Sequence, residues 1–153
     1  METNIVRIGK VSSVDAQNAT VKVFFTDLDD MVSTDLPVLF PQCIQNKAYA
    51  MPDVGENVLC LFLGHGVGDG FCIGCFYTQS EIPPVAELDK VHYAFSDGTY
   101  FEYDRKEHKL KGEIKGDVEL KCTTLKIEVE KDVIIQSGTS ITLKGKTLTQ
   151  VVN

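Results

Sequence analysis

Apolar and polar residues alternate along the first part of the chain with the two-residue period of β-strands. Val6 and Ile8 alternate, Val11 and Val14 continue the apolar spacing less regularly, and Val21, Val23 and Phe25 form a second run. The polar residues 15–18 between the two runs are typical of a turn. The pattern therefore predicts a β-hairpin.

Two later runs are apolar at almost every position. Residues 58–63 form the first and residues 71–77 the second, and the glycine-rich residues 64–70 connect them. Short continuous apolar runs are typical of strands that are buried on both faces. We therefore expect two fully buried strands joined by a flexible loop.

The intervening residues 26–53 are less regular and contain Pro37 and Pro41. Proline removes a backbone donor from a sheet, so this region should consist of loops and short edge strands. No amphipathic helix pattern accompanies the strands. Five strands in about 80 residues predict a small closed or nearly closed barrel, such as an OB-fold, over residues 1–80.

A polar linker with two adjacent prolines is predicted over residues 81–90. Alternation then returns in a second hairpin pattern, which consists of Val91, Tyr93 and Phe95, a tight turn at Asp97-Gly98, and Thr99, Phe101 and Tyr103. We expect this hairpin to begin a C-terminal domain over residues 91–153.

From residue 110 onward the alternation becomes a repeat. Short apolar–polar units recur every seven or eight residues from Val118. They are separated by Gly112, Gly116, Lys131-Asp132, Ser137-Gly138 and Gly145-Lys146. Apolar positions are even-numbered from Leu110 to Cys122 and odd-numbered from Leu125 to Leu143. Because this change reverses the side that faces inward, a corner is expected between them.

Each repeat offers only two or three apolar side chains, too few to fill a wide single-chain β-helix. Three chains wound together would supply three such faces around a narrow axis. We therefore expect a trimeric, triple-stranded β-helix, with a single-chain solenoid or meander as the alternative. About eight strands stacked at about 4.8 Å would give a rod on the order of 40 Å long. The expected core residues of the trimer are Val118, Leu120, Ile127, Val129, Val133, Ile135, Ile141 and Leu143.

Composition narrows the range of partners. The 153 residues carry a net charge of −7, which argues against a nucleic-acid partner, since nucleic-acid-binding surfaces are basic. The odd number of cysteines, five, argues against a disulfide framework. No apolar run is long enough to span a bilayer, and the first residues do not have the pattern of a signal peptide. Synthesis and assembly are therefore expected in the cytoplasm.

Four segments in a fixed order carry a resemblance to a known family. They are residues 9–15 (GKVSSVD), 36–39 (LPVL), 52–59 (PDVGENVL) and 74–77 (GCFY). Together they resemble the baseplate assembly protein V family of contractile phage tails, whose relatives include the spikes of phage-tail-like bacteriocins and type VI secretion systems. Residues 92–103 are similar to the start of the family's rod.

The resemblance implies an all-β protein with an N-terminal OB-fold collar followed by a C-terminal trimeric β-helix. It implies a structural central spike under the tail tube, driven into the target cell envelope when the sheath contracts. The implied partners are two further copies of the chain, baseplate and tail-tube proteins bound through the N-terminal domain, and the target envelope. The chain would assemble in the bacterial cytoplasm and then form part of a phage tail or tail-like particle.

Two features of the family are not expected here. Some members bind iron at the tip through a His-x-His pair near the C-terminus, but no histidine follows His108. A separate tip protein at the C-terminal end is the alternative. The length also leaves no room for the lysozyme domain of some larger spikes.

Several residues could carry chemistry, and each has a simpler interpretation. Cys72 and Cys75 have the spacing of a metal or redox pair, but a structural zinc site needs four ligands and no second pair exists, so packing is favoured. The glycine-rich residues 64–70 lack the phosphate-binding motif and are expected to form a loop.

The remaining candidates are acidic residues and histidines. Asp27, Asp29 and Asp30 lack the glycine and distal glutamate of a calcium loop, so a solvated loop is favoured. His65, His92 and His108 are dispersed and accompany no nucleophile motif. We therefore expect no catalytic residue, no cofactor and no metal site. The alternative function is an OB-fold module that binds an oligosaccharide or nucleic acid and carries a β-solenoid extension.

Overall fold

The computed structural model describes residues 5–64, 68–147 and 149. The described chain is nearly all β-structure, as predicted, with antiparallel sheets and one short 3₁₀ helix at Thr26–Leu28. It divides into two compact units, Met1–Glu113 and Ile114–Asn153. The expected domains, residues 1–80 and 91–153 with a linker between them, remain a prediction.

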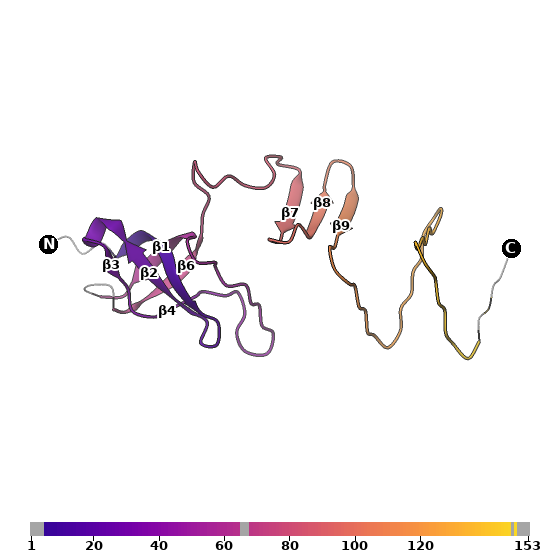
Figure 1. The fold of residues 1–153 in the computed structure, drawn as a ribbon, viewed down its shortest axis with the longest axis horizontal. Helices are drawn as coiled ribbons and strands as arrows, with labels where there is room; N and C mark the ends of the chain where they lie inside the picture. Colours follow the sequence, from indigo (N-terminus) through magenta and orange to yellow (C-terminus); the bar gives the residue numbers. More distant parts are fainter. Residues whose placement is uncertain (1–4, 65–67, 148, 150–153) are drawn as a thin grey trace. The chain divides into compact units, whose positions relative to one another are not determined.

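The N-terminal sheet has the strand order β3-β2-β1-β5-β6. Figure 1 labels β1, β2, β3, β4 and β6 of this sheet. Its strands are β1 (Val6–Asp15), β2 (Thr20–Phe25), β3 (Met31–Val32), β5 (Asn57–Phe62) and β6 (Gly70–Cys75), and β4 (Leu36–Pro37) pairs with β2. A single parallel bridge joins Val38, just after β4, to Cys72 in β6. In the described residues the sheet does not close.

The predicted first hairpin is confirmed by the antiparallel pairing of β1 with β2. Its turn is fixed by the Asp15 carboxylate, which accepts hydrogen bonds from the backbone N–H of Gln17 (3.0 Å) and from the Asn18 backbone and side chain (3.1 and 2.8 Å). The side-chain and backbone hydrogen bonds from Asn18 lower the pKa of Asp15. The pairing register shifts between Val11 and Ser13, and this bulge explains why the apolar alternation weakens there.

One hydrophobic core lies on one face of this sheet. Phe25 and Phe62 meet edge to face in it, with ring centroids 5.8 Å apart. The buried core residues are Val11, Val21, Val23, Phe25, Leu36, Val58, Cys60, Phe62 and Cys72. They come from alternate positions of their strands, as a half-buried sheet requires.

The expectation that β5 and β6 are buried on both faces is wrong for the single chain. In β5, Val58, Cys60 and Phe62 are buried, whereas Leu59 and Leu61 are only partly covered. In β6 the outward Phe71 and Ile73 are exposed. The apolar run reflects a second face that the rest of the described chain covers only in part.

The second sheet, which we call the neck sheet, has the order β7-β8-β9. Its strands are β7 (Lys90–Ala94), β8 (Tyr100–Asp104) and β9 (Lys109–Glu113). The predicted hairpin is confirmed: Asp97 accepts a hydrogen bond from the Thr99 backbone (2.8 Å), and Gly98 adopts a positive φ of 86° that favours glycine. β9 adds a third strand through a polar turn in which Asp104 accepts hydrogen bonds from the Lys106 and Glu107 N–H groups.

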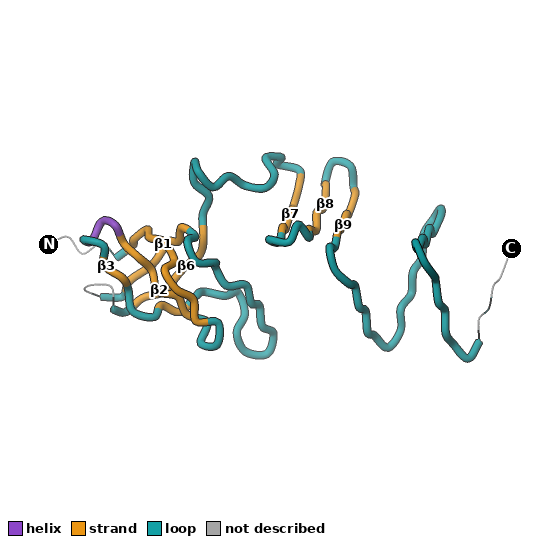
Figure 2. Tube along the Cα trace, in the orientation of Figure 1, coloured by secondary structure: helices purple, strands orange, loops and turns teal. Residues whose placement is uncertain are grey.

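Residues 114–147 contain no strand, helix or hydrogen-bonded turn. Figure 2 shows this segment as loop along its described length. The β-helix expected there is therefore not formed within one chain.

Candidate functional site

All eight predicted core residues of the C-terminal segment lie exposed in the single chain. Their exposed fractions range from 51% at Val129 to 78% at Leu120. Monomeric soluble proteins rarely leave so many large apolar side chains uncovered in succession. The segment is therefore as apolar as a protein core, but no other part of the described chain buries these side chains.

The backbone of this segment bends at regular intervals. Bends lie at residues 115–116, 123, 130–131, 138–139 and 146, which reproduces the seven- or eight-residue repeat. The predicted separators at residues 116, 131, 138 and 146 coincide with bends, and the predicted corner between residues 122 and 125 is the bend at residue 123. Gly112 is the exception among the separators, because it lies inside β9.

Four straight runs lie between the bends, at residues 117–122, 124–129, 132–137 and 140–145. Side chains alternate between the two sides of an extended run. In each run, one side carries apolar residues, including all eight predicted core positions, and the other side is mainly polar. Ile134, 85% exposed, is the one large apolar residue on the polar side of the described runs.

Local polar contacts support this division. The Ser137 hydroxyl oxygen accepts hydrogen bonds from the Thr139 and Ser140 N–H groups (3.3 and 3.1 Å), which stabilises the bend there. On the polar side of the second run, Lys126 forms an ion pair with Glu128. The Lys126–Glu128 pair lies wholly on the polar side, and Ser137 lies at the end of the third run, where the bend begins.

The neck sheet also has one apolar and one polar face. Directly paired residues share a face, so Val91, Tyr103 and Leu110 form one row, and Tyr93 and Phe101 form the next. Phe95 adds to this face through an edge-to-face contact with Phe101, with ring centroids 6.4 Å apart. We call these six residues the aromatic face, and all six are exposed.

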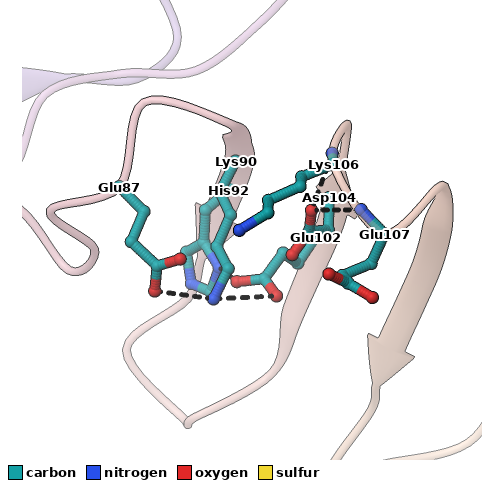
Figure 3. Close-up of polar contacts among 7 residues, drawn as sticks. All are labelled: Glu87, Lys90, His92, Glu102, Asp104, Lys106 and Glu107. Carbon is teal, nitrogen blue, oxygen red and sulfur yellow. Dashed lines mark hydrogen bonds and ion pairs between the residues drawn. The ribbon is translucent and has the colours of Figure 1, made fainter.

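The polar face of the neck sheet is the more deeply buried one. Glu102 is only 8% exposed. One of its carboxylate oxygens lies 3.0 Å from His92 Nδ1, and the other lies 3.8 Å from Lys90 Nζ. Lys90 also pairs with Glu87 at 2.9 Å (Figure 3). The His92 ring stacks on Tyr100. Burying a carboxylate is costly unless it is paired, and Glu102 has the Lys90 ammonium and the His92 ring nitrogen as partners here.

Two titratable groups of this face have shifted pKa values. The hydrogen bond to Glu87, with Glu102 and Asp104 nearby, raises the pKa of Lys90. Hydrogen bonds from the Glu107 and Lys106 N–H groups lower the pKa of Asp104. Both shifts favour the charged forms that hold the sheet and its turn together.

The sequence predicted no catalytic or metal-binding role for His92, and its pairing with Glu102 was not identified from it. The available signal was parity: Lys90 and His92 alternate with Val91 and Tyr93, and so must share the opposite face. Burial of that polar face could not be read from alternation. His108 lies in the turn before β9 with a positive φ of 50°, and His65 lies outside the described residues.

Cys72 and Cys75 do not come together as a site. Cys72 is buried directly opposite Cys60, and contact with the Cys72 thiol, with burial, raises the pKa of Cys60. The Cys75 thiol instead donates a hydrogen bond to the Glu56 carboxylate (2.9 Å). Burial together with this carboxylate raises the pKa of Cys75 to about 12. In the described residues, no three His, Cys, Asp or Glu side chains are grouped so as to hold a metal ion.

The acidic residues of the 26–53 region have structural roles. Asp27 forms an ion pair with Arg7 at 3.0 Å, while Asp29 and Asp30 adopt positive φ angles of 48° and 60° beyond the 3₁₀ helix. Short polar residues tolerate this conformation better than most. In the glycine-rich loop, residues 65–67 lie outside the described part, so the interpretation of that loop remains a prediction.

A further apolar surface lies on the N-terminal sheet. It combines the partly covered Leu59 and Leu61 with exposed residues of the two neighbouring strands. Leu61 pairs with Val6 on one side and with Phe71 on the other, and Ile8 pairs with Leu59, so these side chains share one face. We call Val6, Ile8, Leu59, Leu61, Phe71 and Ile73 the outer sheet face.

A hollow of about 490 Å³ lies beside the same sheet. Its lining includes Glu56 and Glu81 together with Phe76 and Tyr77. Two carboxylates at such a hollow disfavour an anionic ligand.

The chain matches no known family model and no curated protein. None of the helical residues in the described part forms a helix long and apolar enough to cross a membrane.

Proposed function

We propose that this chain is the structural central spike of a contractile tail or related injection device. In this proposal it acts as a homotrimer whose C-terminal segments wind into a triple-stranded β-helix. The rod helps to puncture the target cell envelope and carries no catalytic residue. The observation that carries the proposal is the C-terminal segment, which is regular in its bends and side-chain alternation but unpaired in one chain.

The geometry of that segment supports three chains rather than one. Extended runs of six residues leave backbone N–H and C=O groups that require partners when the apolar side is buried. The described segment does not pair with itself, so strands of other copies would supply both the hydrogen bonds and the cover. A narrow axis would then contain Val118, Leu120, Ile127, Val129, Val133, Ile135, Ile141 and Leu143.

We propose that the N-terminal sheet is an OB-fold collar. β1 lies between β2 and β5, and the parallel bridge from Val38 to Cys72 joins β6, at one end of the strand order, to the residues just after β4, which pairs with β2. A hydrogen bond from the Leu39 N–H to the Cys72 carbonyl (2.9 Å) reinforces that bridge. These features support a nearly closed five-stranded barrel of the OB type.

The proposed partners follow from the same division of the chain. The collar binds baseplate and tail-tube proteins, and the outer sheet face is an apolar surface suited to protein contact. The rod meets the target envelope, with a separate tip protein as a further partner at its C-terminal end. Assembly takes place in the bacterial cytoplasm before incorporation into the tail or tail-like particle.

The solution mass tests the proposal directly. Light scattering after size exclusion should give about 51 kDa, three times the 16.9-kDa chain. Negative-stain images should show a rod on the order of 40 Å beyond the collar, from about eight strands stacked at about 4.8 Å. A mass near 17 kDa would reject the trimer and, with it, the spike.

The second candidate is an OB-type binding module, which the hollow beside Phe76 and Tyr77 favours for an uncharged oligosaccharide. Glu56 and Glu81 in its lining and the net charge of −7 weigh against nucleic acid. Isothermal titration with neutral oligosaccharides, and filter binding with single-stranded DNA at low salt, test this candidate. Saturable binding by a monomeric protein would favour it over the spike.

A further inference from the structure

Cys60 in β5 and Cys72 in β6 face each other in the core of the N-terminal sheet. They are direct partners in the strand register, and both side chains are fully buried. Their thiols are in hydrogen-bond contact. The sequence pointed to the spacing of Cys72 and Cys75, whereas the strand register brings Cys72 opposite Cys60.

The backbone hydrogen bonds around the two cysteines identify the type of pair that they form. The Leu63 N–H donates to the Asp69 carbonyl (2.9 Å), whereas the Phe62 N–H points the other way and donates to the Ile5 carbonyl (2.7 Å). Hydrogen-bonded and non-hydrogen-bonded pairs alternate along antiparallel strands. The cysteine pair lies two positions from Phe62 along the same strands and is therefore non-hydrogen-bonded. In such pairs the Cα atoms lie about 4.5 Å apart, which is within the range of about 4.4–6.8 Å that a disulfide spans.

From this arrangement we propose that Cys60 and Cys72 are an oxidation site, at which a peroxide converts the two thiols to a disulfide that joins β5 to β6. The site belongs to the single chain and does not depend on the proposed trimer. It adds one covalent link to a protein whose odd number of cysteines argues against a framework of several.

The reaction has two steps. The Cys72 sulfur, as the thiolate, attacks one oxygen of hydrogen peroxide, the O–O bond breaks, and the other oxygen leaves as hydroxide and takes up the proton that Cys72 released. The Cys60 sulfur, on losing its proton, then attacks the Cys72 sulfenic acid, the S–O bond breaks, and a second water leaves. The two thiols lose two electrons and two protons in total, and the peroxide is reduced to two waters.

The surroundings favour this pair over Cys75. The hydrogen bond from the Cys60 thiol lowers the pKa of Cys72, and the thiolate is the form that reacts. Cys75 instead donates to Glu56 and keeps its proton, because burial and that carboxylate raise its pKa to about 12. β6 is the last strand in the order, so local opening of this end strand would admit a small oxidant to the core.

The disulfide would close a loop over residues 60–72, which contains the glycine-rich connection between β5 and β6. Closing a loop restricts the unfolded chain, so the oxidised N-terminal sheet should be more stable than the reduced one. Reducing conditions in the cytoplasm would keep the two thiols free, and the proposed transfer to an extracellular particle would expose them to oxidants.

Peroxide oxidation of the folded chain, followed by mass spectrometry, tests the site. A variant with Cys43→Ser, Cys75→Ser and Cys122→Ser retains only the proposed pair. After hydrogen peroxide and then catalase, the protein is unfolded and its free thiols are alkylated with iodoacetamide. The product should be lighter by two hydrogen atoms, carry no alkyl group and give a linked peptide pair that contains Cys60 and Cys72. The urea midpoint should rise, and dithiothreitol should reverse both changes.

The matched control adds Cys60→Ala, which should leave oxygen on Cys72, form no link within the chain and show no rise in the urea midpoint. Peptide mapping of the oxidised wild type makes the same test without any substitution. Two thiols that both remain open to alkylation, oxygen adducts on Cys72 without a link, or a wild-type link from Cys72 to Cys75 would each overturn the proposal. None of these results bears on the solution mass, so the trimer is tested separately.

Discussion

The N-terminal sheet and the C-terminal segment share the same alternation of apolar and polar residues. They differ in that the apolar side is buried in the sheet and exposed in the segment. In β2, Val21, Val23 and Phe25 are essentially inaccessible, because β1, β5 and the following strands fold back over them. In the segment, Ile127 and Val129 occupy equivalent alternate positions and remain more than half exposed. Alternation of apolar and polar residues predicts an apolar face that must be buried. The topology of the chain determines whether the same chain can bury it.

The neck sheet combines properties of the N-terminal sheet and of the C-terminal segment. Its strands pair with one another within one chain, like those of the first sheet, but its aromatic face is uncovered, like the apolar side of the C-terminal segment. Backbone pairing and apolar burial are thus separate requirements. The comparison predicts that changes in the N-terminal core act on the single chain, whereas changes in the C-terminal segment act on assembly.

The largest expected effect is that of Ile127→Asp. In the proposed trimer three carboxylates would be buried without partners, at a cost of several kcal/mol each, so assembly should be lost. Light scattering should then report a monomer. The control is Thr124→Asp, which introduces the same charge on the polar side of the same straight run and should remain trimeric. An assembled Ile127→Asp protein would contradict the expected core.

Phe25→Ala should destabilise the N-terminal sheet by about 3–5 kcal/mol, because it removes a fully buried ring that packs against Phe62. Urea unfolding followed by circular dichroism measures this change. Leu88→Ala is the control, since Leu88 is 94% exposed and its truncation should change stability by less than about 0.5 kcal/mol. Equal stability of the two variants would argue against the core as described.

Glu102→Gln tests whether the buried polar face holds the neck sheet. The change removes the charge that pairs with His92 and Lys90 and should cost about 1–3 kcal/mol. Hydrogen exchange at the β7 and β8 amides should rise, with Glu107→Gln in the exposed turn as the control. Unchanged protection in Glu102→Gln would show that the pairing is dispensable.

The smallest effect concerns the first turn. The pKa of Asp15 is lowered in the folded chain, so its contribution to stability is present above its unfolded pKa and lost as pH falls through the folded value. Thermal unfolding between neutral and strongly acidic pH should therefore show a smaller acid-induced decrease in Asp15→Asn than in the wild type. Identical acid sensitivity would exclude this contribution.

The strands and turns were largely predictable because alternation and turn chemistry are local. The runs around Val21 and Tyr93 became paired strands, and Asp97-Gly98 became the predicted turn. The weak spacing near Val11 reflected a bulge, which sequence alone did not identify.

Burial was less predictable because it depends on which surfaces meet. The apolar run of β5 suggested two covered faces, but Leu59 and Leu61 lack a full cover in one chain. Glu102 would ordinarily be placed at the surface, yet its pairing with His92 and Lys90 allows it to be buried. The repeat and its bends followed from sequence, whereas the predicted trimer core awaits a test with more than one copy.

The unpaired C-terminal segment has a consequence for production of the protein in a cell. The proposed trimer forms only when three copies meet, so its stability depends on the concentration of the chain. The amount of assembled trimer should therefore rise more steeply than the amount of chain synthesised. At low expression, extended residues such as those around Gly138 would be open to proteolytic cleavage before partners arrive. For the proposed trimer, gene dosage and the speed of translation would determine how many trimers are completed, and chains that find no partners would be removed by degradation.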